Sequence, residues 1–285
     1  LGLLISNGKV VCPPLFNKPA FIIYKDGKID IEKVCSKPGM EVKISNRLIT
    51  FSKEGYNKHS STAPCFYDLL NDKPEINADG NTIIRIAGDT IKEVMKTRKG
   101  QYVKSIPVGL TFSIPAGLCP EILNIGEKVT ITLNRDTNGI DWKNVQHAIE
   151  AGPMLLDSSK NAINMKLEGW KTENSIATQA ARLDFTDMRG PKIAVGIDKK
   201  ANIMVLTING RIRESVGATH DDMSGILKSY GAVKAMGFDP GGSSTLVMDG
   251  KTLNISPYNH QYENNIFALP PEPRAVANAI IGWQE

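Results

Sequence analysis

The chain has 285 residues, a hydrophobic fraction of 41% and a net charge of +4, which together exclude a disordered chain and allow one large domain or two small ones. The charge is small, and no run of basic residues is interleaved with aromatic ones, so neither nucleic acid nor a membrane surface is expected as a partner. No stretch approaches the roughly 18 uninterrupted apolar residues of a membrane-spanning helix, so no transmembrane segment is predicted.

The chain starts at Leu1, without an initiator Met and inside a predicted strand. We therefore expect that a signal peptide, a propeptide or part of the domain precedes it. The cysteines are widely scattered and have no C-x-x-C spacing, which permits disulfides but argues against a zinc site: Cys12, Cys35, Cys65 and Cys119. The motifs call for no metal and no cofactor.

Residues 1–50 alternate β-branched runs with Asn7-Gly8 and Asp26-Gly27. Such dipeptides between strand-like runs are strong hairpin signals, so a β-meander is predicted. Residues 52–81 are polar and small, which predicts a surface insertion.

The middle of the chain returns to short predicted strands, at 82–87, 103–108, 110–114 and 128–133. A short helix is predicted over 89–99, and a helix or turn over 141–151. The irregular segment 161–190 is typical of a loop beside a cleft.

A further hairpin is predicted from strands at 191–198 and 202–207, and Thr219 opens the clearest helix. Thr219 and Asp222 have the spacing of an N-cap and the third helical residue. Helix capping explains His220, Asp221 and Asp222 better than a metal cluster does. Residues 274–281 alternate like a final strand that would place Arg274 and Asn278 on one face.

These patterns predict an α+β fold, mainly antiparallel or mixed sheet built from hairpins with a few helices packed against it. We expect a single domain over 1–285.

The stretch from Gly237 to Gly250 has the richest chemistry in the chain: a strand end, a glycine loop with one acid and three hydroxyls, and a second strand. Pro240 favours an extended conformation at Asp239, so the carboxylate projects from the strand end. Glycines at 241 and 242 allow positive φ or close approach of a ligand to the backbone. Taken alone, this stretch is explained better as a structural hairpin with a capped turn, and it is the sequence around it that favours a functional loop.

Three common catalytic signatures are absent: G-x-S-x-G, H-E-x-x-H and the phosphate-binding G-x-x-x-x-G-K-[ST]. The usual serine hydrolase, zinc protease and nucleotide triphosphatase classes are therefore excluded.

The order of several motifs resembles the phosphodiester glycosidase domain family over nearly the whole chain. These motifs are Gly2 to Val10, Gly152-Pro153-Met154-Leu155-Leu156, Pro191 to Gly196, Asn209-Gly210-Arg211, Ser215 to Thr219, the loop Asp239 to Thr245, and Arg274 to Asn278.

Three features depart from the family pattern. The Asn-Gly-Gly-Phe-Phe-like segment that normally precedes the first motif is absent, so the expected domain lacks its N-terminal segment. Lys192-Ile193 replaces Arg-Thr, which keeps a cation but loses a planar fork and a hydroxyl. Pro240 replaces the first glycine of the loop.

The resemblance implies a glycoside hydrolase that cleaves a sugar-1-phosphodiester or a related glycan linkage, with a carbohydrate or sugar-phosphate substrate. It implies Asp239 as the catalytic carboxylate, Lys192 as a source of positive charge, and Asn278 as the residue that orients the substrate or an acid. Glu150 is a candidate second acid that the family does not mark. The implied substrate-binding residues are Gly241, Gly242, Ser243, Ser244, Thr245, Arg274, Gly152 and Arg211.

Two other classes of function stay open. A non-catalytic module that binds glycans or phosphoglycans is favoured by the missing segment and by Lys192-Ile193. A structural domain, in which the glycine loop is only a hairpin, would bind no ligand. The resemblance also implies an extracytoplasmic location, that is, secreted, periplasmic or surface-anchored; the oligomeric state is not predicted.

Overall fold

A computed structural model describes residues 2–15, 17–35, 39–68, 71, 73–106, 109–134, 138–170, 187–255, 275–276 and 278–282. The chain divides into two compact units. Unit 1 comprises Leu1–Ala151 and Asn164–Ala181, and unit 2 comprises Gly152–Ile163 and Arg182–Glu285. The prediction of one domain over 1–285 stays a prediction.

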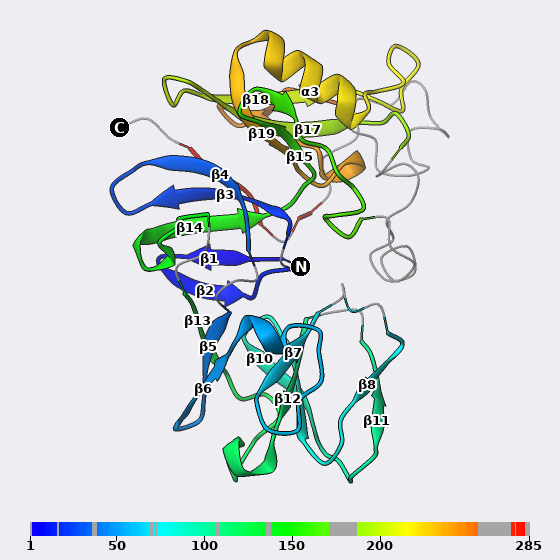
Figure 1. Ribbon diagram of the computed structural model, residues 1–285. Coiled ribbons are helices and arrows are strands. Elements are labelled where there is room, and N and C mark those ends of the chain that lie inside the picture. The colour runs from blue at the N-terminus through cyan, green and yellow to red at the C-terminus, as the bar shows by residue number, and fades with distance from the viewer. Residues whose placement is uncertain are drawn as a thin grey trace. The chain divides into compact units, whose positions relative to one another are not determined.

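Unit 1 is built from antiparallel strands (Figure 1). Its largest sheet has the order β2 (Lys9–Cys12), β1 (Leu4–Ser6), β14 (Val145–Glu150), β3 (Pro19–Tyr24) and β4 (Ile29–Lys33). A second sheet has the order β10 (Thr90–Lys96), β9 (Thr82–Ala87), β12 (Leu110–Ile114) and β7 (Cys65–Tyr67). The smaller sheets are β13 (Thr130–Leu133), β5 (Met40–Ile44) and β6 (Arg47–Phe51), and the pair β11 (Tyr102–Lys104) and β8 (Glu75–Asn77).

Alternating apolar residues of these strands form the core of unit 1. Phe51 stacks on Phe112 with ring centroids 4.6 Å apart, and it meets Phe66 edge-on at 6.0 Å. All three rings are fully buried. Among the described residues of this unit, short 3-10 helices connect strands at η1 (Lys53–Gly55), η2 (Ala116–Leu118) and η3 (Trp142–Asn144).

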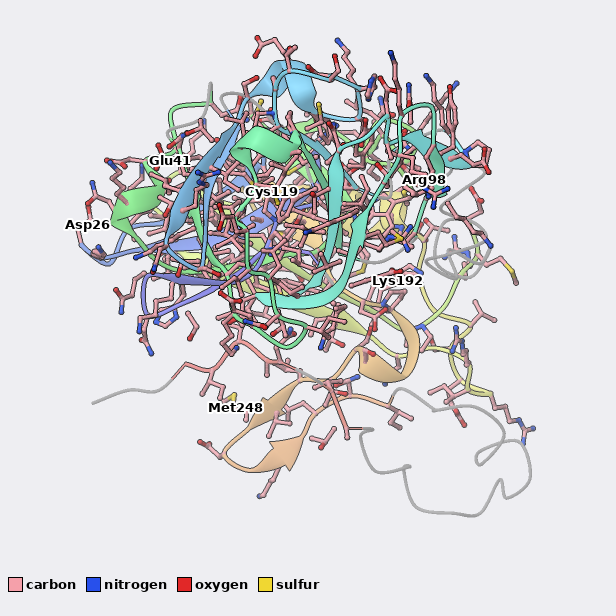
Figure 2. All side chains as sticks on the ribbon, turned by 90° about the horizontal axis from the view of Figure 1, so that it is seen from below. Asp26, Glu41, Arg98, Cys119, Lys192 and Met248 are labelled. Carbon is pink, nitrogen blue, oxygen red and sulfur yellow. The ribbon has the colours of Figure 1, made fainter. Side chains whose placement is uncertain are left out.

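Unit 2 contains a five-stranded antiparallel sheet. Its order is β16 (Lys160–Asn161), β15 (Met154–Asp157), β19 (Ala232–Gly237), β17 (Lys192–Asp198) and β18 (Ile203–Ile208). The helix α3 (His220–Ser229) lies along one face, where Met223 and Leu227 are buried (Figure 1). After the 3-10 helix η4 (Gly241–Ser243), a hairpin of β20 (Val247–Met248) and β21 (Lys251–Thr252) follows; Met248, labelled in Figure 2, is exposed on it.

The predicted hairpin architecture is confirmed, whereas the expectation of several helices is wrong for the described residues, where α3 is the single α-helix and the fold is mainly β. The predicted helix over 89–99 is strand β10, which forms a hairpin with β9 through Gly88 at φ +61°. The segment 141–151 forms η3 and β14. β-branched residues along both segments favour extended backbone once a partner strand is present.

Two further expectations need correction. Within 52–81, predicted as a surface insertion, β7 pairs with β12 and Phe66 is fully buried, so this part belongs to the core. The final strand expected over 274–281 is not found in its described residues, 275, 276 and 278–281. No described helix is long and apolar enough to cross a membrane.

Candidate active site

Four chain segments that the motifs single out meet at one end of the unit 2 sheet. The strand β15 begins directly after Gly152-Pro153, β17 begins at Lys192, β18 ends before Asn209, and β19 ends before Asp239. The registers set Met154 opposite Met236, Ala194 opposite Gly237, and Lys192 opposite Ile208. Antiparallel pairing therefore places these four strand ends side by side.

The glycine loop is fixed to this sheet end by hydrogen bonds. Gly241, at φ +72°, donates its N–H to the carbonyl of Pro191 at 3.0 Å. The single hydroxyl hydrogen of Ser244 is shared between the carbonyls of Pro191 at 3.4 Å and of Asp239 at 3.3 Å. Because Ser244 is fully buried and its hydroxyl is used within the loop, its observed role is to hold the loop together.

Asp239 is exposed and lies two residues after the last residue of β19, Gly237. The N–H of Phe238 donates to the carbonyl of Ile193 at 3.0 Å, which continues the β17–β19 pairing one residue beyond the strand. Continued by one more residue, this register sets Asp239 opposite Lys192. A reachable carboxylate thus stands at the sheet end, next to the strand that begins with the buried lysine.

Arg211 is a cation beside the glycine loop. Its backbone has φ +57° in the turn after β18. An ideal Cβ built on Gly241 would lie 3.1 Å from Arg211 Nη1, and one on Gly190 would lie 3.8 Å from Arg211 Nε. The guanidinium therefore lies against both glycines, with the fork geometry that suits a phosphate.

Lys192, labelled in Figure 2, is only 2% exposed. It shares a face of β17 with Ala194 and Gly196, the face on which an ideal Cβ of Gly196 would lie 3.3 Å from Leu227 of α3. Its Nζ has a long contact of 3.5 Å with the carbonyl of Met188. The Lys192 side chain therefore lies on the face of the sheet that α3 covers, near the start of this helix, and is almost inaccessible to solvent.

His220, the first residue of α3, is buried beside this lysine and was not predicted as a site residue. Burial, helped by the charge of Lys192 and opposed by Asp187, lowers its pKa to about 3, so the imidazole is neutral at physiological pH. The pattern of the helix start gave no sign of this, because capping residues surround the histidine in the sequence.

The predicted helix cap is confirmed. Thr219 accepts the N–H of Asp222, and the Asp222 carboxylate accepts the N–H of Thr219 at 2.8 Å. Asp222 also forms an ion pair of 2.7 Å with Arg189, whose Nη1 donates to the carbonyl of Gly217 at 3.3 Å. These contacts with Thr219, followed by those with Arg189, hold the pKa of Asp222 below its usual range.

The structure places the remaining predicted residues as follows. Gly152 is buried, and an ideal Cβ on Gly237 would lie 3.2 Å from its carbonyl oxygen. Gly242 is buried, whereas Ser243 and Thr245 are half-buried in the loop. Asn278 is exposed and outside any strand, so no described contact brings it to the sheet end. Arg274 lies outside the described residues.

Glu150, the candidate second acid, belongs to a buried cluster in unit 1. Its Oε2 accepts the N–H groups of Leu3 at 2.5 Å and Leu15 at 2.9 Å. Burial raises its pKa to about 7, against the effect of these bonds and of Lys18. The contacts indicate that Glu150 ties three segments of unit 1 together.

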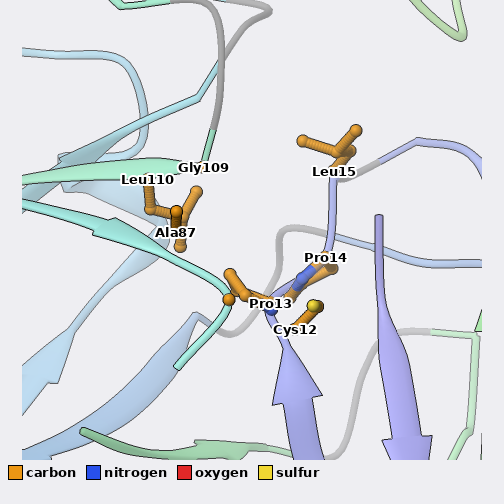
Figure 3. A pocket seen from close by; sticks show the side chains of 8 residues that line it. Cys12, Pro13, Pro14, Leu15, Ala87, Gly109 and Leu110 are labelled. Atoms are coloured by element: carbon orange, nitrogen blue, oxygen red, sulfur yellow. The ribbon is translucent and has the colours of Figure 1, made fainter. Parts of the chain in front are cut away.

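A small pocket in unit 1 has a lining without acids, bases or hydroxyls, apart from the weakly acidic thiol of Cys12 (Figure 3). Burial raises the pKa of that thiol. Its lining residues are Cys12, Pro13, Pro14, Leu15, Ala87, Gly88, Gly109 and Leu110. The pocket offers no group for hydrolysis, and the sheet end of unit 2 remains the candidate site.

Comparisons with known proteins agree with the family resemblance that the motifs indicated. A model of the phosphodiester glycosidase family matches residues 80–281. The uncharacterized SPbeta prophage-derived protein YomE of Bacillus subtilis (strain 168) is 31% identical over 108 residues, which are 37% of this chain and 16% of YomE.

Two solved structures resemble the chain in fold. One is a hypothetical protein from Synechocystis, with a TM-score of 0.51 and 19% identity, over 90% of this chain and 46% of the other. The second is a Burkholderia pseudomallei K96243 protein whose name assigns it provisionally to the exported proteins, with a TM-score of 0.51 and 15% identity, over 90% of this chain and 58% of the other. The chain thus spans less than two thirds of each of these three relatives. Because the family model matches most of its length, the chain belongs to the phosphodiester glycosidase family.

Proposed function

We propose that the protein is a glycoside hydrolase that cleaves a sugar-1-phosphodiester or a related glycan linkage at the sheet end of unit 2, with Asp239 as the catalytic carboxylate. The observation that supports this most directly is the arrangement around the glycine loop. Asp239 is exposed at one end of the loop, and the Arg211 guanidinium lies against Gly241 within it.

The reaction breaks the bond between the anomeric carbon and a phosphodiester oxygen and consumes one water. The products are a free sugar and a phosphate monoester, which keeps the electron pair of the broken bond. Because this leaving group is only weakly basic, one carboxylate that attacks the sugar or activates the water is chemically sufficient. A guanidinium fork would bind the phosphate oxygens in both the substrate and the product.

The other predicted residues take different roles in this proposal. Gly242, Ser243 and Thr245 would contact the sugar or phosphate, whereas the buried Ser244 would hold the loop. Since Lys192 is 2% exposed, its ammonium would act on Asp239 through its electric field and not by direct contact with a large ligand. Roles for Gly152, Arg274 and Asn278 at the substrate stay predictions.

An extracytoplasmic location is part of the proposal, supported by the name of the Burkholderia relative. The substrate would then be a carbohydrate or sugar phosphate outside the cytoplasm, and no cofactor is invoked.

A non-catalytic glycan- or phosphoglycan-binding module is the second candidate. The burial of Lys192, in place of the arginine that the family pattern carries, supports it. Such a module would keep Arg211 and the loop as a phosphate-binding surface and release no sugar.

The test compares Asp239→Asn with Asp249→Asn, a matched change at an exposed aspartate in the β20–β21 turn. The substrates are methyl phosphodiesters of glucose, mannose and N-acetylglucosamine at the anomeric oxygen, and free sugar is measured. We expect Asp239→Asn to lose about 100-fold or more of the rate and Asp249→Asn to keep it. Full rate in Asp239→Asn would reject the assignment, and saturable binding without turnover by the unsubstituted protein would favour the binding module.

A further inference from the structure

Two asparagine side chains connect the loop that carries Asp239 with the turn that carries Arg211. We propose that Asn254 and Asn209 form a clamp that sets the position of Asp239 relative to Arg211, and that both are positioning residues for hydrolysis. This inference rests on the proposed function. Asn254 lies in none of the motifs, and Asn209, although it opens the motif Asn209-Gly210-Arg211, was not predicted as a site residue.

Asn254 holds the far end of the glycine loop. Its Nδ2 donates to the carbonyl of Ser244 at 2.6 Å, and its Oδ1 accepts the N–H of Leu246 at 2.7 Å. The side chain is 7% exposed. Its amide thus bonds the backbone on either side of Thr245 with one donor and one acceptor, as a neighbouring strand would.

Asn254 is connected to the backbone of Asp239 by hydrogen bonds through Ser244. The Ser244 hydroxyl donates to the Asp239 carbonyl at 3.3 Å, and the Ser244 N–H donates to the Gly241 carbonyl at 3.0 Å. By holding the Ser244 carbonyl, Asn254 therefore holds the residue whose own hydrogen bonds fix the backbone of Asp239 and Gly241.

Asn209 binds Ile255, the residue after Asn254, to the turn that carries Arg211. Its Oδ1 accepts the N–H of Ile255 at 2.7 Å, and its carbonyl accepts the hydroxyl of Ser215 at 2.7 Å. Asn209 is separated from Arg211 by Gly210 alone. Residues 254 and 255 are consecutive, so one short piece of backbone bonds the Asp239 loop on one side and the Arg211 turn on the other.

This arrangement would matter for catalysis because an anomeric carbon and its phosphate are joined by a single oxygen. The carboxylate must reach the carbon while the guanidinium holds the phosphate, and small errors in their separation cost large factors in rate. A clamp that fixes both would raise kcat more than it lowers KM.

The two asparagines use different side-chain groups in these bonds, so their aspartate variants are expected to behave differently. Asn254 uses a donor and an acceptor, so Asn254→Asp loses the bond to Ser244 and sets a carboxylate against a carbonyl. Asn209 uses its side-chain oxygen for Ile255, so Asn209→Asp keeps this bond. Asn209→Leu, of similar size, removes it.

The experiment measures amide hydrogen exchange and steady-state hydrolysis in Asn254→Asp, Asn209→Asp and Asn209→Leu, with Asn7→Asp at an exposed unit 1 turn as a charge control. We expect faster exchange at Ser244 in Asn254→Asp, where the bond to the Ser244 carbonyl is lost, and faster exchange at Ile255 in Asn209→Leu. In both, kcat should fall about 10-fold or more while KM changes less than about threefold. Asn209→Asp should keep the slow exchange at Ile255, and Asn7→Asp should change neither exchange nor hydrolysis.

A pH profile separates positioning from general loss of structure. When the carboxyl introduced by Asn254→Asp is protonated, it can donate to the Ser244 carbonyl, so kcat should recover relative to the unsubstituted protein as the pH is lowered. Unchanged exchange at Ser244 in Asn254→Asp, or equal effects of Asn209→Asp and Asn209→Leu on Ile255, would overturn the clamp. Absence of turnover by the unsubstituted protein would overturn the proposed function. The amide hydrogen exchange rates would still show whether the two asparagines hold the loop and the turn.

Discussion

The Arg211 guanidinium lies against Gly241, where an added Cβ would come within 3.1 Å of Nη1. Gly241 also has φ +72° and donates its N–H to Pro191. Absence of a side chain therefore serves two purposes at this position: it permits the left-handed backbone and leaves room for a cation against the loop. The two purposes can be tested separately, because Gly250 also has a left-handed backbone but has no neighbour where a Cβ would lie.

Gly241→Ala should impair phosphate recognition beyond its effect on stability. Its matched control is Gly250→Ala, at φ +74° in an exposed hairpin turn with nothing within 4 Å of the new Cβ. Each alanine should cost about 1 kcal/mol from backbone strain. In Gly241→Ala the guanidinium must also move, so KM for a sugar-1-phosphodiester should rise clearly, whereas Gly250→Ala should leave it unchanged. Equal KM values in the two variants would contradict the proposed contact between Arg211 and the substrate.

Arg211→Lys should weaken phosphate binding while leaving the fold intact. Arg211 is exposed, so little packing is lost, but the ammonium of lysine lacks the planar fork that bonds two phosphate oxygens. We expect KM to rise by about 10-fold, equivalent to about 1.4 kcal/mol, with kcat less affected. Arg213→Lys, at another exposed arginine of the same turn, should have no effect. If both lysine variants bind the phosphodiester like the unsubstituted protein, Arg211 does not hold the phosphate.

Features that depend on neighbouring residues were predictable from the sequence. The spacing of Thr219 and Asp222 predicted a capping box, and the structure contains it. Pro240 and the two glycines after it predicted a tight loop beyond a strand end, and Asp239 is exposed there. These signals are local because each depends on backbone geometry within one turn.

Features that depend on distant partners were not predictable. The segment around Ile91 and Val94 was expected to be helical, but it is extended because β9 pairs with it. The short apolar run at Phe66 is buried only because β12 lies beside it. Likewise, the contact of Arg211 with Gly241 and the bond from Ile255 to Asn209 join segments far apart in sequence, and the spacing of the motifs did not indicate either of them.

Gly217→Ala should be strongly destabilising. Gly217 has φ +97°, and an added Cβ would lie 2.2 Å from the carbonyl oxygen of Gly190, within the bridge that pairs Gly190 with Ala218. Because backbone cannot move aside as a side chain tip can, we expect a loss of more than about 3 kcal/mol in the free energy of unfolding. Gly231→Ala, at φ +93° with open space around it, should lose about 1 kcal/mol. Urea denaturation of both variants measures the difference, and similar losses would mean that the close approach of residues 190 and 217 is absent in solution.

Unit 1 contains a buried group of charges around Glu150 that should make stability depend on pH. Lys18, which is 1% exposed, lies over the ring of Trp170 with Nζ 3.0 Å from its centroid. Its pKa is lowered to about 8 by burial, and the nearby Glu150, Glu168 and Asp68 oppose that shift. Burial raises the pKa of Glu150 from 4.5 to about 7.

The consequence for Glu150 is a loss of stability as the pH rises. Between about pH 4.5 and about pH 7 the unfolded chain has released this proton while the folded chain still holds it. Folding is therefore favoured most at the acid end of this window, and the free energy of unfolding falls toward neutral pH, by at most about 3 kcal/mol from this group. Lys18 acts in the opposite direction at higher pH, since stability rises as the pH passes its lowered pKa of about 8.

Glu150→Gln should remove the decline, because glutamine keeps an oxygen for the N–H groups of Leu3 and Leu15 but has no proton to release. Urea denaturation of this variant and of the unsubstituted protein, between about pH 5 and about pH 7.5, measures the two slopes. Glu75→Gln, at an exposed position of β8, should keep the slope of the unsubstituted protein. Lys18→Met should steepen the decline, since losing the nearby ammonium raises the pKa of Glu150 further. If the slope persists in Glu150→Gln, another group is responsible, and the buried carboxyl is ionised throughout this range.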